Sequence, residues 1–217
     1  LNLDLNAMDF RKIIKKINLL DEKDQENLFR LNKKINGITN INIDKIYSKS
    51  NLLNSAESII SFKNGNIYIE KLIFNINNIG AADISGSIYN YDKITKFYFN
   101  NTINIDNLNK FNSKFNIRKK IQGQKSINLD AEVNLNAPNI KIDKIEVDEE
   151  AFNDENNKFV EMNVNSILFD KSYETLFNFA NLKLFVQTII LIYIMNKIAI
   201  FTFFTILIRC NTDNTIE

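Results

Sequence analysis

Charged residues cluster at three places in this chain, and these are the first places to look for chemistry. Five acidic residues lie between Asp148 and Glu155, and carboxylate oxygens are ligands that calcium prefers. Their spacing fits no EF-hand loop, because that loop needs a glycine at its sixth position. A solvated acidic loop over residues 148–157 is therefore the prediction, and no metal is expected.

Two basic clusters, Arg11–Lys16 and Arg118–Lys120, would suit anionic lipid head groups. The alternative is that the first is the wet face of a helix and the second a charged turn. Nucleic acid is not an expected partner, because the net charge is only +1 and single strands bind to exposed aromatic rings. Phe97 and Phe99 alternate in phase with Ile103, which predicts core positions for them instead.

The chain contains no histidine, which removes the commonest general base and metal ligand and also the Ser-His and Cys-His nucleophile pairs. It has no glycine-rich phosphate loop and no dinucleotide-binding fingerprint. Cys210 is the single cysteine, so neither an intrachain disulfide nor a cysteine-based metal site is expected. We therefore expect a protein that is not an enzyme and that carries no cofactor.

A short recurring phrase predicts the elements that position these residues. It is present at Asn40–Ile46, Asn66–Leu72 and Asn139–Ile145, with a looser copy at Thr102–Leu108. Each copy begins with apolar residues at alternate positions, which is typical of a strand, and then shifts the apolar phase by one residue. Because such a shift exchanges the two faces of a strand, a bulge or a bend is expected in each copy.

From Ile38 to about Phe169 apolar and polar residues alternate, which predicts antiparallel strands with one apolar and one wet face. Asn64-Gly65 is a strong hairpin signal, and Phe159–Leu168 is predicted to be a further strand. Parallel strand pairs need crossover connections of a dozen or more residues, and most segments between the predicted strands are shorter than that. The predicted fold is mostly β with flanking helices: an extended, curved antiparallel repeat sheet shaped like a groove.

Helical spacing is found ahead of this region. Leu1, Leu3 and Leu5 alternate like the end of a strand, and two amphipathic helices are predicted within residues 8–36. Asp21 is expected to cap the second helix, which Gly37 would end. We predict five parts in chain order. They are a strand end with two helices over 1–37, a β-repeat region over 38–168, a short helical linker over 169–183, a hydrophobic helix over 184–208 and a polar tail over 209–217.

The hydrophobic segment Leu184–Ile208 contains 16 Leu, Ile, Val or Phe residues among its 25. As a helix it would be about 37 Å long, enough for a hydrocarbon core of about 30 Å. Lys197 costs about 3 kcal/mol on the insertion scale, which the apolar residues offset. A transmembrane helix is the prediction. The alternative is a reading-frame error in the tail, because the composition changes abruptly after Phe185.

The stretch Phe62–Leu72, followed by Gly80–Ile88, resembles the C-terminal region of the AsmA-like and TamB-like superfamily. Members share a hairpin with glycine at the turn, then a strand, then a strand with two glycines that opens the next unit. The helical segment at 8–36 and the strand-to-helix step at Ile105–Leu108 also fit, so the resemblance covers roughly residues 1–168.

The first residue is Leu1 and not Met, so the chain is expected to be a fragment. The resemblance implies a bacterial envelope protein with its β region in the periplasm. It further implies a curved sheet with an apolar groove that binds or channels phospholipid between the inner and outer membranes. AsmA-like proteins carry their membrane anchor at the N-terminus, whereas the hydrophobic segment lies at the C-terminal end of this chain.

A sheet with one apolar face must cover it with helices, with another sheet or with a ligand. The predicted helices are a thin cover for so many strands, so phospholipid acyl chains and a membrane are the expected partners. The alternative is a membrane-anchored structural or interaction module with a dry, self-packed β core. The residues expected to face lipid are Ile67, Ile69, Ala82, Ile84, Ile88, Phe97, Phe99, Ile127, Leu129 and Val133.

Overall fold

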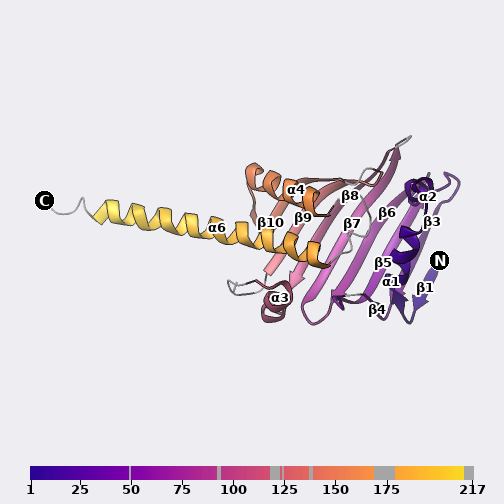
Figure 1. Ribbon diagram of the computed structural model, residues 1–217, viewed down its shortest axis with the longest axis horizontal. Helices are drawn as coiled ribbons and strands as arrows, with labels where there is room; N and C mark the ends of the chain where they lie inside the picture. Colours follow the sequence, from indigo (N-terminus) through magenta and orange to yellow (C-terminus); the bar gives the residue numbers. More distant parts are fainter. Residues whose placement is uncertain are drawn as a thin grey trace.

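The computed structural model describes residues 1–212 except residues 49, 92–93, 118–122, 124, 137–138 and 169–178. A large open sheet of nine strands dominates the described residues, in the order β1-β3-β5-β6-β7-β8-β9-β10-β11 (Figure 1). The strands of this sheet are β1 Asn2–Leu5, β3 Gly37–Ile43, β5 Leu53–Lys63, β6 Asn66–Ile76, β7 Gly80–Tyr91, β8 Ile94–Ile105, β9 Lys125–Asn134, β10 Asn139–Val147 and β11 Glu150–Ala151.

The sheet is mixed, not purely antiparallel as the sequence predicted. β1 runs parallel to β3, and two short strands, β2 (Met8–Asp9) and β4 (Ile46–Tyr47), form a second parallel pair. The connection from Leu5 to Gly37 is long enough for the crossover that a parallel pair requires. All other neighbours in the large sheet are antiparallel, as predicted.

Two copies of the recurring phrase contain the expected bulge. The register shifts between Ile69 and Leu72 where β6 pairs with β7, and between Ile142 and Lys144 where β10 pairs with β9. In the other two copies the strand ends instead. β3 stops at Ile43 and the chain turns to β4, whereas β8 stops at Ile105 and leads into a helix. The same sequence phrase therefore supports two different local structures.

The hairpin predicted at Asn64-Gly65 is confirmed, because Lys63 pairs with Asn66 and both turn residues have positive φ, 53° and 84°. The two N-terminal helices are present but shorter than predicted. Asp21 accepts a hydrogen bond from the backbone of Asp24 at 2.8 Å, as a cap should, but no helix is found over residues 28–36. The helices are α1 Phe10–Asn18, α2 Glu22–Asn27, α3 Leu108–Phe115, α4 Asp154–Leu168 and α6 Phe179–Thr212.

The prediction of a strand at Phe159–Leu168 is wrong, because this segment lies within α4. Asn153 caps that helix by accepting a hydrogen bond from the backbone of Asn156 at 2.9 Å, and Asp154 and Glu155 favour its positive end. The predicted linker over 169–183 lies outside the described residues up to 178, and its remainder belongs to α6.

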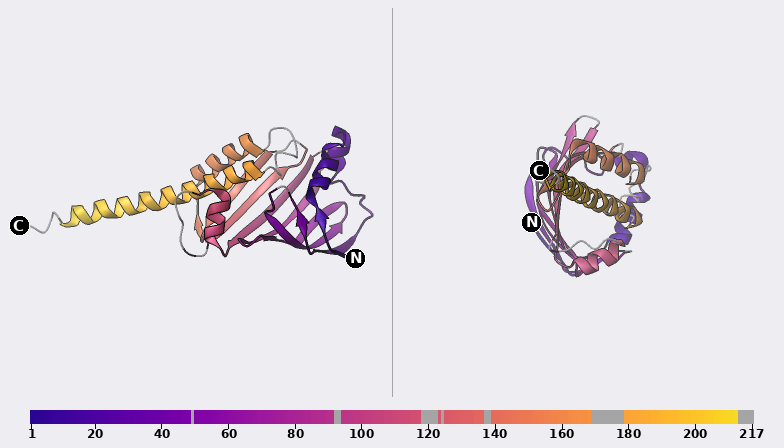
Figure 2. Two further views of the ribbon diagram at one scale, coloured as in Figure 1. Left: turned by 60° about the horizontal axis from the view of Figure 1, so that its bottom comes forward. Right: turned by 90° about the vertical axis from the view of Figure 1, so that its left-hand side faces the viewer.

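The sheet is curved, and α1, α3, α4 and α6 lie on its concave side (Figure 2). α6 runs along the concave face and then continues far beyond the last strands (Figure 1). The convex face is polar. Asn42 donates to Asp4 at 2.8 Å, Lys96 pairs with Glu132 at 2.5 Å, and Tyr89 contacts three other tyrosine rings. Only the concave face therefore needs an apolar cover.

The edge of β10 is covered by side chains of α4. The Asn165 amide accepts a hydrogen bond from the Ile140 backbone N–H and donates one to the Ile140 carbonyl, each at 2.8 Å. The carboxylate of Glu161 accepts from the Ile142 backbone N–H at 2.8 Å. Backbone groups at a sheet edge otherwise attract further strands, so α4 closes the sheet on this side.

Gly86 provides a test of the central packing of the sheet. A Cβ at this position would lie 2.2 Å from the Tyr98 carbonyl oxygen and 2.9 Å from the Phe99 Cα. Because backbone atoms must then move, we expect Gly86→Ala to lower the free energy of unfolding by about 1–3 kcal/mol in urea denaturation followed by circular dichroism. Gly37→Ala is the control, since no atom lies within 4 Å of its Cβ position. Equal stability of the two variants would contradict this packing.

Candidate functional site

The candidate site is the concave apolar face, and strand register brings its residues together. Residues paired across neighbouring strands point to the same face of a sheet. One row reads Ile67, Ile88, Phe97 and Val133, and each of these residues pairs with the next. Parallel rows join the other predicted residues, and all ten residues expected to face lipid lie on this one face. These further rows, each running across β6, β7, β8 and β9, are Ile69–Gly86–Phe99–Ala131, Leu72–Ile84–Asn101–Leu129 and Phe74–Ala82–Ile103–Ile127.

The bulge in β6 allows the residues before and after it to share the concave apolar face. Ile69 and Leu72 are three residues apart, so in a regular strand their side chains would point to opposite faces. The register shift between them places both opposite residues of the same β7 face, Gly86 and Ile84. The phase slip in the sequence therefore preserves a single apolar face instead of interrupting it.

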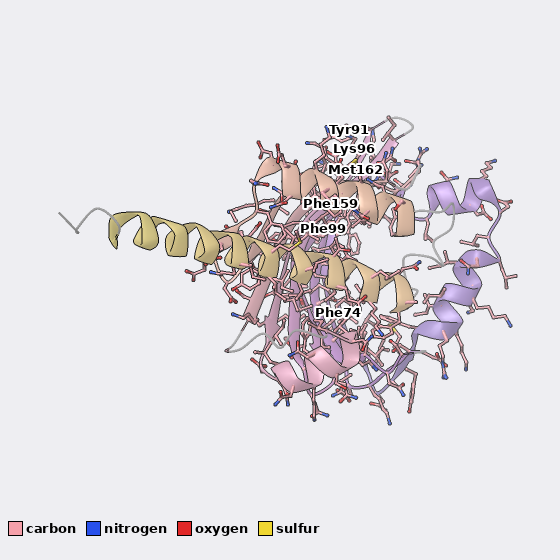
Figure 3. All side chains as sticks on the ribbon, turned by 60° about the vertical axis from the view of Figure 1, so that its left-hand side comes forward. Phe74, Tyr91, Lys96, Phe99, Phe159 and Met162 are labelled. Atoms are coloured by element: carbon pink, nitrogen blue, oxygen red, sulfur yellow. The ribbon has the colours of Figure 1, made fainter. Side chains whose placement is uncertain are left out.

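Over β8–β10 this face is covered by protein. Ile127, Leu129 and Val133 are less than 9 % exposed and form one core cluster with α3, α4 and α6. Ala82, Phe97 and Phe99 pack against the same cluster, and the two phenylalanine rings stack with centroids 4.9 Å apart. In the view of Figure 3, Phe99 and Phe74 are seen on the two sides of α6. The helices that provide the cover contribute Phe111, Phe115, Val160, Val164, Val186, Ile189, Ile190, Ile192 and Tyr193.

The middle of the face lies outside this core cluster. The remaining predicted residues, Ile67, Ile69, Ile84 and Ile88, belong to neither of the two core clusters of the described residues. All but Ile88 are partly exposed. Register adds three partly exposed neighbours that were not among the residues predicted from the sequence. We name the whole set the open stretch, and its members are Ile60, Phe62, Ile67, Ile69, Leu72, Ile84 and Ile88.

The three added residues carried a signal in the sequence. Ile60 and Phe62 alternate directly before the Asn64-Gly65 hairpin, and a two-residue turn fixes which residues they oppose on the return strand. Ile60 pairs with Ile69, and Phe62 pairs with Ile67. The position of Leu72 could be assigned only after the bulge was located.

The open stretch is bounded on both sides along the groove. Towards β1, a second core cluster of Ile43, Ile46 and Ala56 packs against Phe10 of α1. At the hairpin end, the Asn90 amide donates to the Phe29 carbonyl at 3.2 Å and to the Gly65 carbonyl at 2.9 Å. These bonds hold the segment that follows α2 against the turn between β5 and β6, so the opening lies between two fixed walls.

α6 is fixed along its length by polar contacts as well as by its apolar face. The Gln187 amide donates to the Phe115 carbonyl at 2.8 Å, and the Tyr193 hydroxyl donates to Asp148 at 3.2 Å. Lys197 pairs with Glu150. These contacts lie beyond Phe185, where the composition changes. The part of α6 from Phe179 to Ile198 therefore packs as an integral element of the fold, and the alternative of a reading-frame error stays untested.

The prediction of a transmembrane helix over 184–208 is supported in its coarse part, a long apolar C-terminal helix. Residues Phe179–Ile198 form a helix long and apolar enough to cross a membrane by length and composition alone. However, Val186, Ile189 and Ile190 are at most 4 % exposed because they pack on the sheet. Apolar side chains leave water equally well in a protein core and in lipid, so an apolar sequence does not distinguish a buried helix from a membrane-spanning one. One face of this half therefore packs in the core, whereas Leu191 and Met195 on another face are exposed.

The predicted acidic loop contains a hairpin turn whose carboxylates hold α6 in place. Asp148 and Glu149 form the turn between β10 and β11, with φ of 53° and 66°. Asp148 binds the Lys125 ammonium and accepts from the Ser126 backbone N–H at 3.1 Å. Desolvation lowers the pKa of Lys125, but the hydrogen bond and charge of Asp148 outweigh it and raise that pKa above its ordinary value. This ammonium therefore stays charged and paired at neutral pH.

The two basic clusters have separate outcomes. Lys12, Lys15 and Lys16 are exposed on α1, and Arg11 pairs with Asp9 at 2.8 Å. The second cluster, Arg118–Lys120, lies outside the described residues.

Two shallow pockets of about 360 and 410 Å³ lie at strand ends, and both have mainly polar walls. They are formed by turns and are separate from the open stretch.

Comparison of the chain with protein families, with curated proteins and with solved structures finds no match. The resemblance to the AsmA-like superfamily therefore stays a prediction from the sequence.

Two aspartate substitutions on this face should have unequal effects on folding. Leu129 is 6 % exposed within the core cluster, whereas Ile84 is partly exposed and belongs to neither cluster. We expect Leu129→Asp to lower the free energy of unfolding by about 4 kcal/mol or more, and Ile84→Asp by about 1–2 kcal/mol. Urea denaturation measures both, with Ser85→Asp on the opposite face as control. An equal loss at Ile84 and Leu129 would mean that the open stretch is covered.

Proposed function

We propose that this protein handles lipid by binding phospholipid acyl chains on the open stretch of its curved sheet. One observation carries the proposal: seven apolar side chains of three adjacent strands share one face and lie outside both core clusters of the described residues. Six of the seven are partly exposed and Ile88 is 6 % exposed, so an apolar ligand would complete the burial of this face.

The chemistry of the open stretch suits an acyl chain. Its lining is aliphatic apart from Phe62, and Ser58 is a buried polar residue beside it. Each methylene that leaves water contributes about 0.8 kcal/mol, so ten methylenes supply about 8 kcal/mol before the cost of association. No directional polar contact is needed for this gain, which suits a protein that binds chains of varied length.

The cellular setting of the proposal rests on the resemblance to AsmA-like proteins. It places the β region in the periplasm of a bacterial envelope and makes transfer of phospholipid between the inner and outer membranes the task. The long apolar helix α6 is compatible with attachment to a membrane, by length and composition. The proposed role is binding and channelling, without catalysis.

A second candidate function is a membrane-anchored structural or interaction module. The specific observation in its favour is that α3, α4 and α6 already fill the concave face over β8–β10 with a protein core. Under this alternative the open stretch holds no lipid, and partners bind through the polar convex face. The two candidates differ in what occupies the open stretch.

The test is native and denaturing mass spectrometry of the full chain, produced in a bacterium and purified without added lipid. The full chain is required because α6 forms part of the core. We expect about one phospholipid per chain in the wild type and loss of that lipid in Ile84→Asp, because a charge would be buried against an acyl chain.

Ser85→Asp is the matched control, since Ser85 neighbours Ile84 in β7 but points to the convex face and is exposed. It should retain the lipid. A lipid-free wild type, or lipid retained by Ile84→Asp, would overturn the proposal and favour the structural module.

A further inference from the structure

The side of α6 that faces away from the sheet is apolar and exposed. Leu184, Leu191 and Met195 recur at spacings of seven and four residues, and they are 47–59 % exposed. Val186 and Ile190, by which α6 packs on the sheet, lie on the opposite side of the helix. Large apolar side chains exposed at a regular helical spacing mark an interaction surface. We name Leu184, Leu191 and Met195 the outward stripe of α6.

The side of α1 that faces away from the sheet is basic. Phe10 packs against Phe74 on the concave face, with ring centroids 6.3 Å apart. Lys12, Lys15 and Lys16 lie on the other side of the helix and are exposed. Their ammonium groups take part in none of the ion pairs of the described residues. These three charges are therefore available to a partner.

Leu19 lies among these lysines. It follows Lys15 and Lys16 by four and three residues, which places the three side chains on one face of the helix. Leu19 ends the helix with φ of −87° and ψ of −9°, and it is 76 % exposed. An exposed leucine among lysines suits the boundary between lipid head groups and acyl chains, where the ammonium groups meet phosphates and the apolar tip leaves water.

The two outward faces lie on the same side of the molecule. α1 and α6 are both on the concave side of the sheet (Figure 2), and each packs on the sheet by one stripe and presents the opposite one. Neither helix contains an acidic residue. A surface that approaches from this side therefore meets apolar residues of α6 and unpaired positive charges of α1.

We infer that this side of the protein lies on the surface of an anionic phospholipid bilayer. The outward stripe of α6 enters the lipid with the helix parallel to the membrane plane, and the lysines of α1 contact head-group phosphates. Charge complementarity carries the choice of partner, because both helices lack carboxylates and basic residues are drawn to anionic leaflets. The inference does not rest on the proposed binding of acyl chains to the open stretch.

An orientation parallel to the membrane also agrees with the packing of α6. Val186, Ile189 and Ile190 stay buried on the sheet when only the opposite side of the helix meets lipid. A helix that crossed the bilayer over the same residues would have to leave the sheet and uncover its largest core cluster. Attachment by one face satisfies the core and the outward stripe together.

Other partners fit this side less well. An isologous dimer would place basic residues of both copies in an interface to which neither helix brings a carboxylate, and like charges oppose association. Nucleic acid would attract the lysines, but its phosphate backbone gains nothing from Leu19 or from the outward stripe of α6.

Flotation of the full chain with lipid vesicles tests the inference. The wild type should float with vesicles of phosphatidylcholine and phosphatidylglycerol in equal amounts, and much less with phosphatidylcholine alone. Changing Lys12, Lys15 and Lys16 together to Gln should weaken partition by about a hundredfold, because each basic residue near an anionic surface contributes about fivefold.

The matched control changes Lys63, Lys141 and Lys144 to Gln. It removes the same number of charges, and these three lysines are exposed on the convex face. This variant should float as the wild type does. Equal flotation with and without phosphatidylglycerol, unchanged in the α1 variant, would overturn the inference in favour of a helix that crosses the bilayer.

The apolar contact is tested by Leu191→Asp. Because Leu191 is 56 % exposed, the variant should keep the circular dichroism of the wild type. Its partition should fall by about tenfold or more, since a buried leucine is replaced by a charge. Ser85→Asp adds the same charge on the convex face and should have no effect. A wild type that does not float but forms dimers in light scattering would assign this side to a second copy and overturn the inference.

These outcomes are separate from those of the mass spectrometry. Ile84→Asp should float normally even where it loses co-purified lipid, because the open stretch is not part of the contact. Flotation lost in Ile84→Asp would place the contact at the open stretch and overturn the inference. A wild type that carries phospholipid but does not float would support the proposed function alone, and one that floats without carrying phospholipid would support only the surface contact.

Discussion

The fold depends on one constraint: a curved sheet with a single apolar face must keep that face from water. The N-terminal half of α6 meets this constraint over β8–β10, where Ile189 and Ile190 are at most 2 % exposed against the strands. Its polar contacts fix it in one position, from Gln187 at α3 to Lys197 at β11. Removing this helix would expose the largest core cluster of the described residues, so every account of function must leave it in place.

The same constraint makes the open stretch the part of the molecule where function is to be sought. An acyl chain or a protein partner would satisfy Ile69 and Ile84 equally well, because the hydrophobic effect has no directional requirement. Selection among them must come from shape and from the walls, which are the α1 cluster on one side and the segment held by Asn90 on another.

The two edges of the sheet are treated differently. Asn165 and Glu161 of α4 occupy the backbone groups of β10, which prevents another strand from joining there. β1 is short and parallel to its neighbour, and its residues are largely exposed. Growth of the sheet by strand addition is therefore blocked at the β10 edge, and any association along the groove must proceed through side chains, as it does for α6.

The sequence by itself determined most of the strands, the Asn64-Gly65 turn, two of the four expected bulges and the single apolar face, because these follow from local alternation and turn chemistry. It therefore placed all ten lipid-facing candidates on one face. Only the tertiary structure decided which of them are covered, since Ile84 and Leu129 have the same local pattern but different neighbours. It also decided that Phe159–Leu168 is a helix and that one face of the hydrophobic segment packs in the core. An apolar stripe in the sequence predicts that its residues are buried from water. Only long-range packing determines whether protein or a ligand buries them.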